Sequence, residues 1–267
     1  MAKPLYSLSG PKTLFEMSYA EAAELRNKTD VVLIGVGSVE QHGPHLPLGA
    51  DSMQVTELAK RVAMKLRKKQ RDVAIAPVIP FGNSIVHMEF PGSITLRDET
   101  LVAVIKDVCR SLHSHGFTRQ ALLIGHVGNI PAMKIAARET HEELGAEVMV
   151  LNWISVVFKN APKLFKSSRP WYGGEGHGGE YNTSLFMAMH PELIDMKRAK
   201  VNWSKAAQDV YQNPDCDYMF HRYKSLTKSG IIGDPFVSTK ETGDKIFNFA
   251  ADWIVKCVMD KFPGKQG

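Results

Sequence analysis

The sequence predicts an α/β protein with a parallel sheet covered by helices on both faces. Apolar runs typical of strands alternate with longer amphipathic segments typical of helices, which is the pattern of a parallel sheet. The run Val31 to Gly37 is apolar throughout, as expected of a strand buried on both faces. The chain has 267 residues, of which 44% are hydrophobic, enough to bury a large core. Because no repeat or linker interrupts it, we expect one domain over residues 1–267.

Capping residues indicate where the first two helices begin. Ser18 and Glu21 have the spacing of a capping box and predict a short helix that ends near Lys28. Asp51 is expected to cap the second helix, which follows a loop rich in Gly, Pro and His over residues 38–50. The apolar positions of this second helix recur at i, i+3, i+4 and i+7, so one of its faces is predicted to be buried. They are Val55, Leu58, Ala59, Val62, Ala63 and Leu66.

The rest of the chain continues the alternation of strands and helices. The segment 158–179 has no regular pattern, and 202–233 is interpreted as an insertion or an oligomer contact. The predicted elements are strands over 73–79, 121–125 and 148–153, helices over 98–115 and 181–189, a helix from the cap Asn129 to Leu144, and a C-terminal helix from a capping box of Ser238 and Glu241 to about Lys261.

Composition narrows the classes of function and location. The net charge is only +5, and its densest run, residues 65–71, lies at a predicted helix end, where positive charge is favourable. The sequence has no cluster of basic residues with aromatic residues between them, so we expect no nucleic-acid partner. The three cysteines, Cys109, Cys216 and Cys257, are far apart and odd in number, which favours reduced thiols in the cytoplasm. Neither a secretion signal nor a run of about 20 apolar residues is found, so no membrane partner is expected.

Polar side chains follow the ends of three predicted strands, where ligands bind in open parallel sheets. Glu40 and His42 are two residues apart in an extended segment, so their side chains point the same way and form a chelating pair. A carboxylate such as Asp51 has two oxygens and can bridge two ions. Mixed nitrogen and oxygen ligands suit Zn²⁺ or Mn²⁺. The three clusters are Glu40, His42 and Asp51 after the first strand, His126 and Asn129 after the third, and His177 and Glu180 after the fourth.

Other interpretations of these residues stay open at this point. Asp51 is also explained as a helix cap alone, and Glu40 with His42 as a solvated surface pair. Glu180 is also explained by the preference for a carboxylate at a helix N-terminus. The segment Gly35-Val36-Gly37 follows a strand as in a dinucleotide-binding fold, but Glu40 stands where the last glycine is needed. Since a carboxylate there would repel a pyrophosphate, that fingerprint fails.

Five segments resemble a known family. The segment 37–51, GSVEQHGPHLPLGAD, is closely similar to the signature of the creatininase family. Later segments appear in the order found in that family, and the likeness extends from about Val31 to Val258. These later segments are 90–96 (FPGSITL), 125–129 (GHVGN), 177–180 (HGGE) and 233–235 (GDP).

The resemblance implies a three-layer α/β/α fold, a dinuclear metal centre and a homo-oligomer, often a hexamer assembled from dimers. By motif position, Glu40, His42, Asp51 and His126 match family metal ligands, and His177 matches the histidine that handles protons. We therefore expect two divalent ions per chain, Zn²⁺ and/or Mn²⁺.

Three departures limit the transfer of function. Creatininase has a metal-binding Glu two residues after the histidine that His126 matches, whereas this chain has Gly128. Many relatives have a second carboxylate where Asn182 stands, which leaves Glu180 as the expected fifth ligand. Gly173 and Gly174 occupy the place of the Trp-Asp pair that creatininase uses on its substrate. This last departure argues against creatinine as the substrate.

These observations predict a metal-dependent hydrolase that opens a small cyclic substrate. Metal ions lower the pKa of bound water from 15.7 to about 7, and the resulting hydroxide would attack a cyclic amide, a related C–N bond or a cyclic polyol ketone such as a dehydro-inosose. His177 is expected to protonate the leaving atom. Asn83, Ser84 and His87 are expected to line the substrate pocket, although His87 also fits a buried structural role. The alternatives are a non-catalytic metal- or ligand-binding relative and, more distantly, a nicotinamide-dependent oxidoreductase.

Overall fold

The chain folds around a parallel sheet in the computed structural model, which describes residues 10–167, 176–203 and 221–263. Every pairing in this sheet is parallel, and the strand order is β2-β1-β3-β4. The order places the two longest strands at the centre, with Val36 opposite Ile124 at their carboxyl ends. The strands are β1 (Val31–Val36), β2 (Ala74–Ile75), β3 (Arg119–Ile124) and β4 (Glu147–Leu151).

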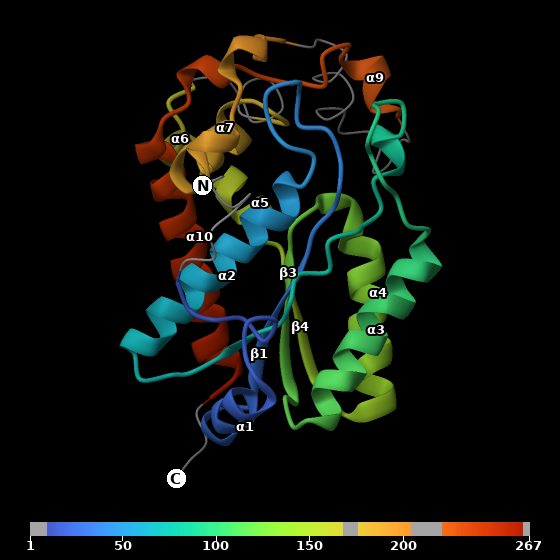
Figure 1. Ribbon diagram of the computed structural model, residues 1–267, viewed down its shortest axis with the longest axis vertical. Coiled ribbons are helices and arrows are strands. Elements are labelled where there is room, and N and C mark those ends of the chain that lie inside the picture. Colours follow the sequence, from blue (N-terminus) through green and yellow to red (C-terminus); the bar gives the residue numbers. More distant parts are fainter. Residues whose placement is uncertain (1–9, 168–175, 204–220, 264–267) are drawn as a thin grey trace, which may run out of the picture.

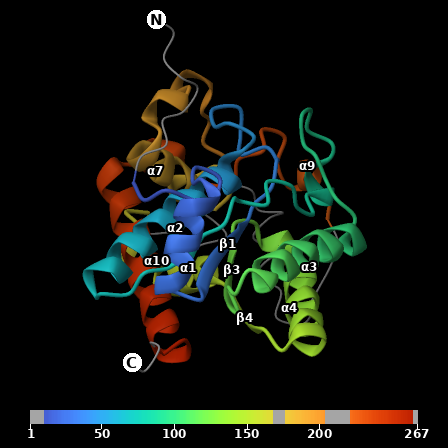
Figure 2. The ribbon, with the colours of Figure 1, turned by 60° about the horizontal axis from the view of Figure 1, so that its bottom comes forward.

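Helices cover both faces of the sheet and make the fold a three-layer α/β/α arrangement, as the sequence predicted (Figure 1). The pair α3 (Asp98–Ser114) and α4 (Ile130–Leu144) packs on one face. The long helices α2 (Ala50–Lys68) and α10 (Lys240–Lys261) pack together on the other, and Figure 2 shows the same separation from a second direction. The shorter helices are α1 (Tyr19–Lys28), α5 (Trp153–Lys159), α6 (Ala161–Leu164), α7 (Glu180–Met189) and α9 (Tyr223–Leu226).

The core lies between these layers. The strand β1 is completely buried, in agreement with its uninterrupted apolar sequence, and β3 is buried from Gln120 to Ile124. One continuous apolar cluster joins the sheet to α2, α3, α4 and α10. The loops after the strands, together with α7 and α9, gather at one end of the molecule, where the candidate site residues lie (Figure 1). None of the described helices is long and apolar enough to cross a membrane.

Several predicted boundaries differ from the structure. The second strand is confined to Ala74–Ile75 and continues only as an isolated bridge between Val36 and Ile79, because Pro77 cannot donate to a ladder. Trp153 begins α5 and does not end a strand. Within the segment predicted to be irregular, Ala161–Leu164 forms the short helix α6.

The predicted cap of the first helix is confirmed, whereas that of the C-terminal helix is wrong. Ser18 and Glu21 form the expected capping box of α1. The C-terminal helix, however, is capped by Thr239, whose hydroxyl accepts from the backbone N–H of Thr242. The predicted Ser238 is one residue too early.

The segment predicted as an insertion also has a place in the fold. Asn202 forms an antiparallel bridge with Gly233, and α9 lies between them in sequence. Residues 204–220 lie outside the described part, as do Gly173 and Gly174. The described residues 221–233 contact the candidate site through Tyr223 and Ile232, so this part of the segment belongs to the fold around the site.

Candidate metal centre

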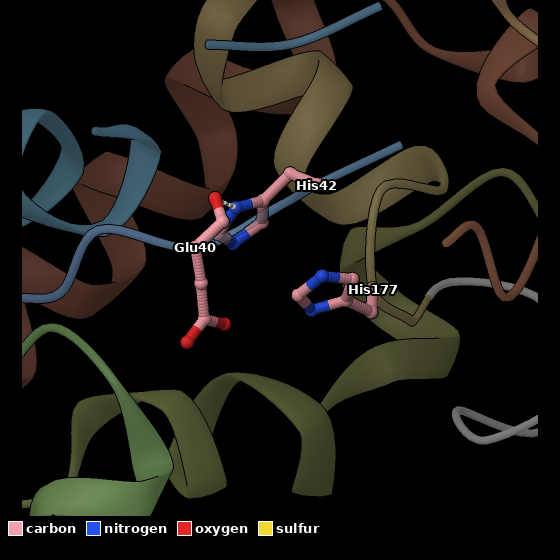
Figure 3. Close-up of side chains that lie close together, drawn as sticks. All are labelled: Glu40, His42 and His177. Atoms are coloured by element: carbon pink, nitrogen blue, oxygen red, sulfur yellow. Dashed lines mark hydrogen bonds between the residues drawn. The ribbon is translucent and has the colours of Figure 1, made fainter. Parts of the chain in front are cut away.

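The loop after β1 supplies Glu40 and His42. Their side chains are almost fully buried, at 1% and 2% exposed, so the solvated surface pair is ruled out. The backbone N–H of Glu40 donates to Leu48 O at 2.9 Å, and His42 Nδ1 lies 3.3 Å from Glu40 O, which leaves His42 Nε2 facing inward. In Figure 3 both side chains lie around a space that His177 also borders.

Asp51 lies in the first turn of α2 and does not cap it, because the N-cap is Gly49. Its Oδ1 is 3.1 Å from His42 Nε2, and its Oδ2 is 3.3 Å from His126 Nδ1. Ser38 Oγ donates to Oδ2 at 2.7 Å and fixes the carboxylate. Asp51 therefore presents one oxygen to each of two imidazoles.

His126 follows β3, the strand next to β1, and lies beside the carboxylates of Glu40 and Asp51. Its Nδ1 is 3.2 Å from Glu40 Oε2, and its Nε2 is 2.9 Å from Asn83 O. A Cβ at Gly128 would overlap His126 Nε2 and would approach Asn83 O to 2.6 Å. The glycine thus allows the close contact between His126 and the 81–89 loop.

The predicted Asn129 cap is a further correction. Although Asn129 stands before α4, its side chain makes no cap hydrogen bond. Its amide instead donates to Gly37 O at 2.8 Å and accepts from the Asn83 backbone N–H at 2.9 Å. It ties together the loops that follow β1, β2 and β3.

Two sets of potential metal ligands emerge, and they share Glu40. Glu40, Asp51 and His126 form a fully buried set, and Glu40, His42 and His177 form the second. Within each set the potential ligand atoms lie within 4.8 Å of one another. The imidazoles of His42 and His177 are stacked, with centroids 4.3 Å apart and planes 19° apart. Because an imidazole binds a metal in the plane of its ring, two stacked rings are poorly oriented to share one ion.

The electrostatics of the cluster suit a cation. Burial would raise the pKa of Glu40, but the charges of His126 and His87 outweigh burial and lower it to about 2. Burial would lower the pKa of His126, yet Glu40 and Asp51 hold it well above its usual range. A proton on His126 therefore balances the buried carboxylates here. A divalent ion would take over this role and displace the proton.

His177 is a neutral ring at the edge of the cluster. Burial and the neighbouring His42 and His87 hold its pKa well below its usual range. It stacks on His87 at 4.8 Å and contacts Tyr223 at 4.7 Å between ring centroids. The backbone N–H of Ile232 donates to His177 O at 2.8 Å.

Glu180 belongs to neither of the two sets of potential metal ligands. Glu180 is fully buried at the start of α7, and its two oxygens accept from the backbone N–H groups of Lys166 and Ser167 at 2.7 and 2.8 Å. Burial raises its pKa. Glu180 thus anchors the chain after α6, and the prediction of a fifth ligand receives no geometric support.

The predicted pocket residues lie against the ligands. Ser84 Oγ donates to Glu40 Oε2 at 2.8 Å, and His87 Nε2 is 3.3 Å from Glu40 Oε1. Asn83 contributes its backbone oxygen to His126, while its side chain donates to Asp98 at 2.5 Å. Ser84 and His87 therefore support Glu40, and their contact with substrate stays a prediction.

Three residues at the site were missed in the sequence. Ser38 holds Asp51, Gln41 contacts two histidines, and Tyr223 stacks on His87 at 4.3 Å. Ser38 and Gln41 lie within the family-like segment, so their position was a usable signal. Tyr223 had no local signal, because only the fold brings α9 to this loop.

Buried carboxylates and imidazoles at the carboxyl ends of a parallel sheet define a metal-dependent hydrolase of the α/β class. A family model described as "Creatininase: Creatinine amidohydrolase" matches residues 15–258. The chain belongs to the creatininase family.

Relatives with different named activities resemble the chain at similar levels. The mycofactocin precursor peptide peptidase of Mycobacterium ulcerans is 27% identical, covering 95% of this chain and 94% of the relative. The creatinine amidohydrolase of Pseudomonas putida is 26% identical, covering 87% and 90%. The 3-dehydro-scyllo-inosose hydrolase of Thermotoga maritima is 28% identical, covering 68% and 58%.

Solved structures support the same fold. A crystal structure of creatinine amidohydrolase has a TM-score of 0.78 and 25% identity, covering 95% of this chain and 98% of that one. A mutant creatininase described as Zn–Zn type has a TM-score of 0.74 and 25% identity, covering 95% and 100%.

Proposed function

We propose that this chain hydrolyses a C–N bond of a small cyclic amide or a peptide-like substrate, with two divalent cations held by Glu40, His42, Asp51 and His126. The observation that carries the proposal is the placement of Asp51, whose two oxygens face His42 and His126 separately. This arrangement fits a carboxylate shared by two ions. Either Zn²⁺ or Mn²⁺ suits such mixed ligands, and zinc is supported by the Zn–Zn type relative.

When bound, the ions supply an acidified water and polarise the carbonyl oxygen. The remaining roles fall to the chain. Glu40 and Asp51 stay ionised because neighbouring imidazoles lower their pKa values. His177 is neutral and borders the same space, so it is placed to take a proton and return it to the leaving nitrogen. Its stacking on His42 favours this role over metal ligation.

A cyclic polyol ketone is the second candidate substrate. The inosose hydrolase supports it, although this chain covers only 58% of that relative's length. The peptide peptidase is covered over 94% of its length, which favours a C–N bond. A non-catalytic relative of the family is the third possibility, and the buried neutral His177 beside the ligands argues against it.

The test is a substrate panel with the metal-free, zinc-loaded and manganese-loaded chain. Short peptides, cyclic amides and a dehydro-inosose are incubated separately, and products are identified by mass spectrometry. We expect metal-dependent cleavage of a C–N bond, with none by the His177→Asn variant at unchanged metal content. Cleavage of the ketone alone would select the second substrate class. Metal binding without turnover of any class would favour the non-catalytic alternative.

We also propose a cytoplasmic homo-oligomer without nucleic-acid or membrane partners, in which the hexamer is the assembly that the family resemblance implies. Free Cys109 and Cys257 are consistent with a reducing compartment. Large exposed apolar residues, including Phe15 and Phe236 at 80% and 57% exposed, offer surface for subunit contacts. Sedimentation velocity tests the assembly, and a monomer at micromolar concentration would contradict it.

A further inference from the structure

Gln41 lies between two proposed metal ligands in sequence but directs its own side chain elsewhere. It is 5% exposed, so its amide must find partners inside the protein. Its Oε1 accepts from the backbone N–H of Gly43 at 2.8 Å. This hydrogen bond fixes the orientation of the amide and turns Nε2 towards the histidines.

The amide nitrogen contacts two imidazoles at once. Gln41 Nε2 lies 3.1 Å from His87 Nδ1 and 3.1 Å from His177 Nε2. The amide nitrogen can donate an N–H to His87 Nδ1. It packs beside His177 Nε2 without donating to it, because that ring nitrogen faces the Gln41 carbonyl oxygen and must itself carry the proton. If His87 Nδ1 accepts, the ring proton of His87 is on Nε2, which faces Glu40 Oε1 at 3.3 Å. Gln41 thus orients His87 as a donor to a metal ligand.

The backbone of Gln41 contacts the second ring as well. Its carbonyl oxygen is also in hydrogen-bond contact with His177 Nε2. His177 Nε2 therefore carries the ring proton and donates to the Gln41 carbonyl oxygen, and the Gln41 amide packs beside it at 3.1 Å. The remaining ring nitrogen, Nδ1, is left free for chemistry at the centre.

The segment 229–233, which packs against the Gln41 side chain, leaves room for its amide. Gly230 has φ +82°, and a Cβ there would overlap Gln41 Oε1. The same segment holds His177 through the hydrogen bond from Ile232 N to His177 O at 2.8 Å. Residues 229–233 thus enclose Gln41 and anchor the histidine that it contacts.

We propose that Gln41 is a positioning residue that fixes the rings of His87 and His177 relative to the metal ligands, and that Gly230 is required because the Gln41 amide occupies the space of a side chain there. The proposal deepens the hydrolase function and rests on it for the catalytic meaning of His177. The positioning itself is a property of the folded chain and can be measured without turnover.

The experiment uses the full chain labelled with ¹⁵N in the histidine rings and loaded with Zn²⁺, which is diamagnetic. Long-range ¹H–¹⁵N spectra report the tautomer and hydrogen bonding of each ring, and His87→Asn and His177→Asn assign the two signals. In Gln41→Met, we expect the ring ¹⁵N resonances of both histidines to shift. Gln54→Met, which replaces another buried glutamine of 1% exposure on α2, is expected to leave them in place.

A second pair of variants keeps Gln41 and tests the space that its side chain occupies. Gly230→Ala should shift the same two histidine signals. Gly145→Ala is the matched control, because Gly145 also has positive φ (+67°) but open space around its Cβ position, and it should leave them unchanged. Unchanged His87 and His177 signals in Gln41→Met or Gly230→Ala, or equal shifts in the matched control, would overturn the proposal. Zinc content, measured on each sample, separates this result from failure of the metal centre.

Discussion

At the scale of single residues, the site is a balance of buried charges. Glu40 and Asp51 are 1% and 4% exposed, and isolated carboxylates at that depth are costly unless they are paired. His42 and His126 supply the pairing in the structure. Each of these side chains is therefore held in place by its opposite charge, which preforms the ligand set before a metal ion binds.

Replacement of Asp51 tests whether one carboxylate serves both ions. In Asp51→Ala, we expect metal content to fall from about two ions per chain to below one, because Asp51 faces both histidines. Plasma mass spectrometry after dialysis measures the content, and circular dichroism checks the fold. His177→Asn, the control, should retain its metal. Two ions per chain in Asp51→Ala would disprove the bridging role.

The pH dependence of metal binding follows from the raised pKa values of His42 and His126. Burial opposes protonation of both rings, but Asp51 and Glu40 raise their pKa values. The raised pKa values favour protons on these rings, and a metal ion that binds the ring nitrogens must displace them. We expect metal binding to release protons and its affinity to decrease as pH falls. Calorimetry in buffers of different ionisation enthalpy measures this release; no buffer dependence would contradict it.

At the scale of elements, the start of α2 and the loops after the strands place the candidate ligands. The helix α2 begins at Ala50, so Asp51 is held in its first turn beside the β1 loop. The helix α10 packs against both α2 and α7. Its N-terminus, close to α7, therefore contributes to the stability of the scaffold below the site.

The corrected cap of α10 can be tested with neighbouring hydroxyls. Thr239→Ala should lower the free energy of unfolding by about 1 kcal/mol, because it removes the acceptor for Thr242 N. Ser238→Ala is the matched control and should have the smaller effect, since Ser238 Oγ makes only a long contact of 3.5 Å with Glu180 O. Urea denaturation of both variants gives the comparison. A larger loss for Ser238→Ala would restore the capping box predicted from the sequence.

At the scale of the whole molecule, the buried sheet holds the three strand-end loops in register. The central strands β1 and β3 pair over their full length, which brings the Glu40 and His126 loops side by side. The apolar cluster across the sheet is continuous. The sheet thus brings together loops whose potential ligand atoms, within each set, lie within 4.8 Å of one another.

A central core residue tests this dependence on the sheet. Leu122 in β3 is fully buried, so Leu122→Ala should lower the free energy of unfolding by about 2–5 kcal/mol through lost burial and a cavity. Ile135→Ala on α4, where Ile135 is 38% exposed, should change stability by less, about 1 kcal/mol. Equilibrium denaturation measures both variants. An equal decrease in the free energy of unfolding for both variants would contradict the central role of Leu122 in the core.

The sequence by itself determined the α/β class, the capping box at Ser18 and the candidate ligands Glu40, His42, Asp51 and His126, which the fold brings together. These features are local, because apolar periodicity, hydroxyl spacing and a continuous motif can be read along the chain. Only the tertiary structure decided that Glu180 anchors Lys166 and Ser167, that Asp51 is no cap, and that Tyr223 reaches the site. The physical reason is that a buried polar group takes whichever partner the packed elements bring to it, and sequence spacing does not record that partner.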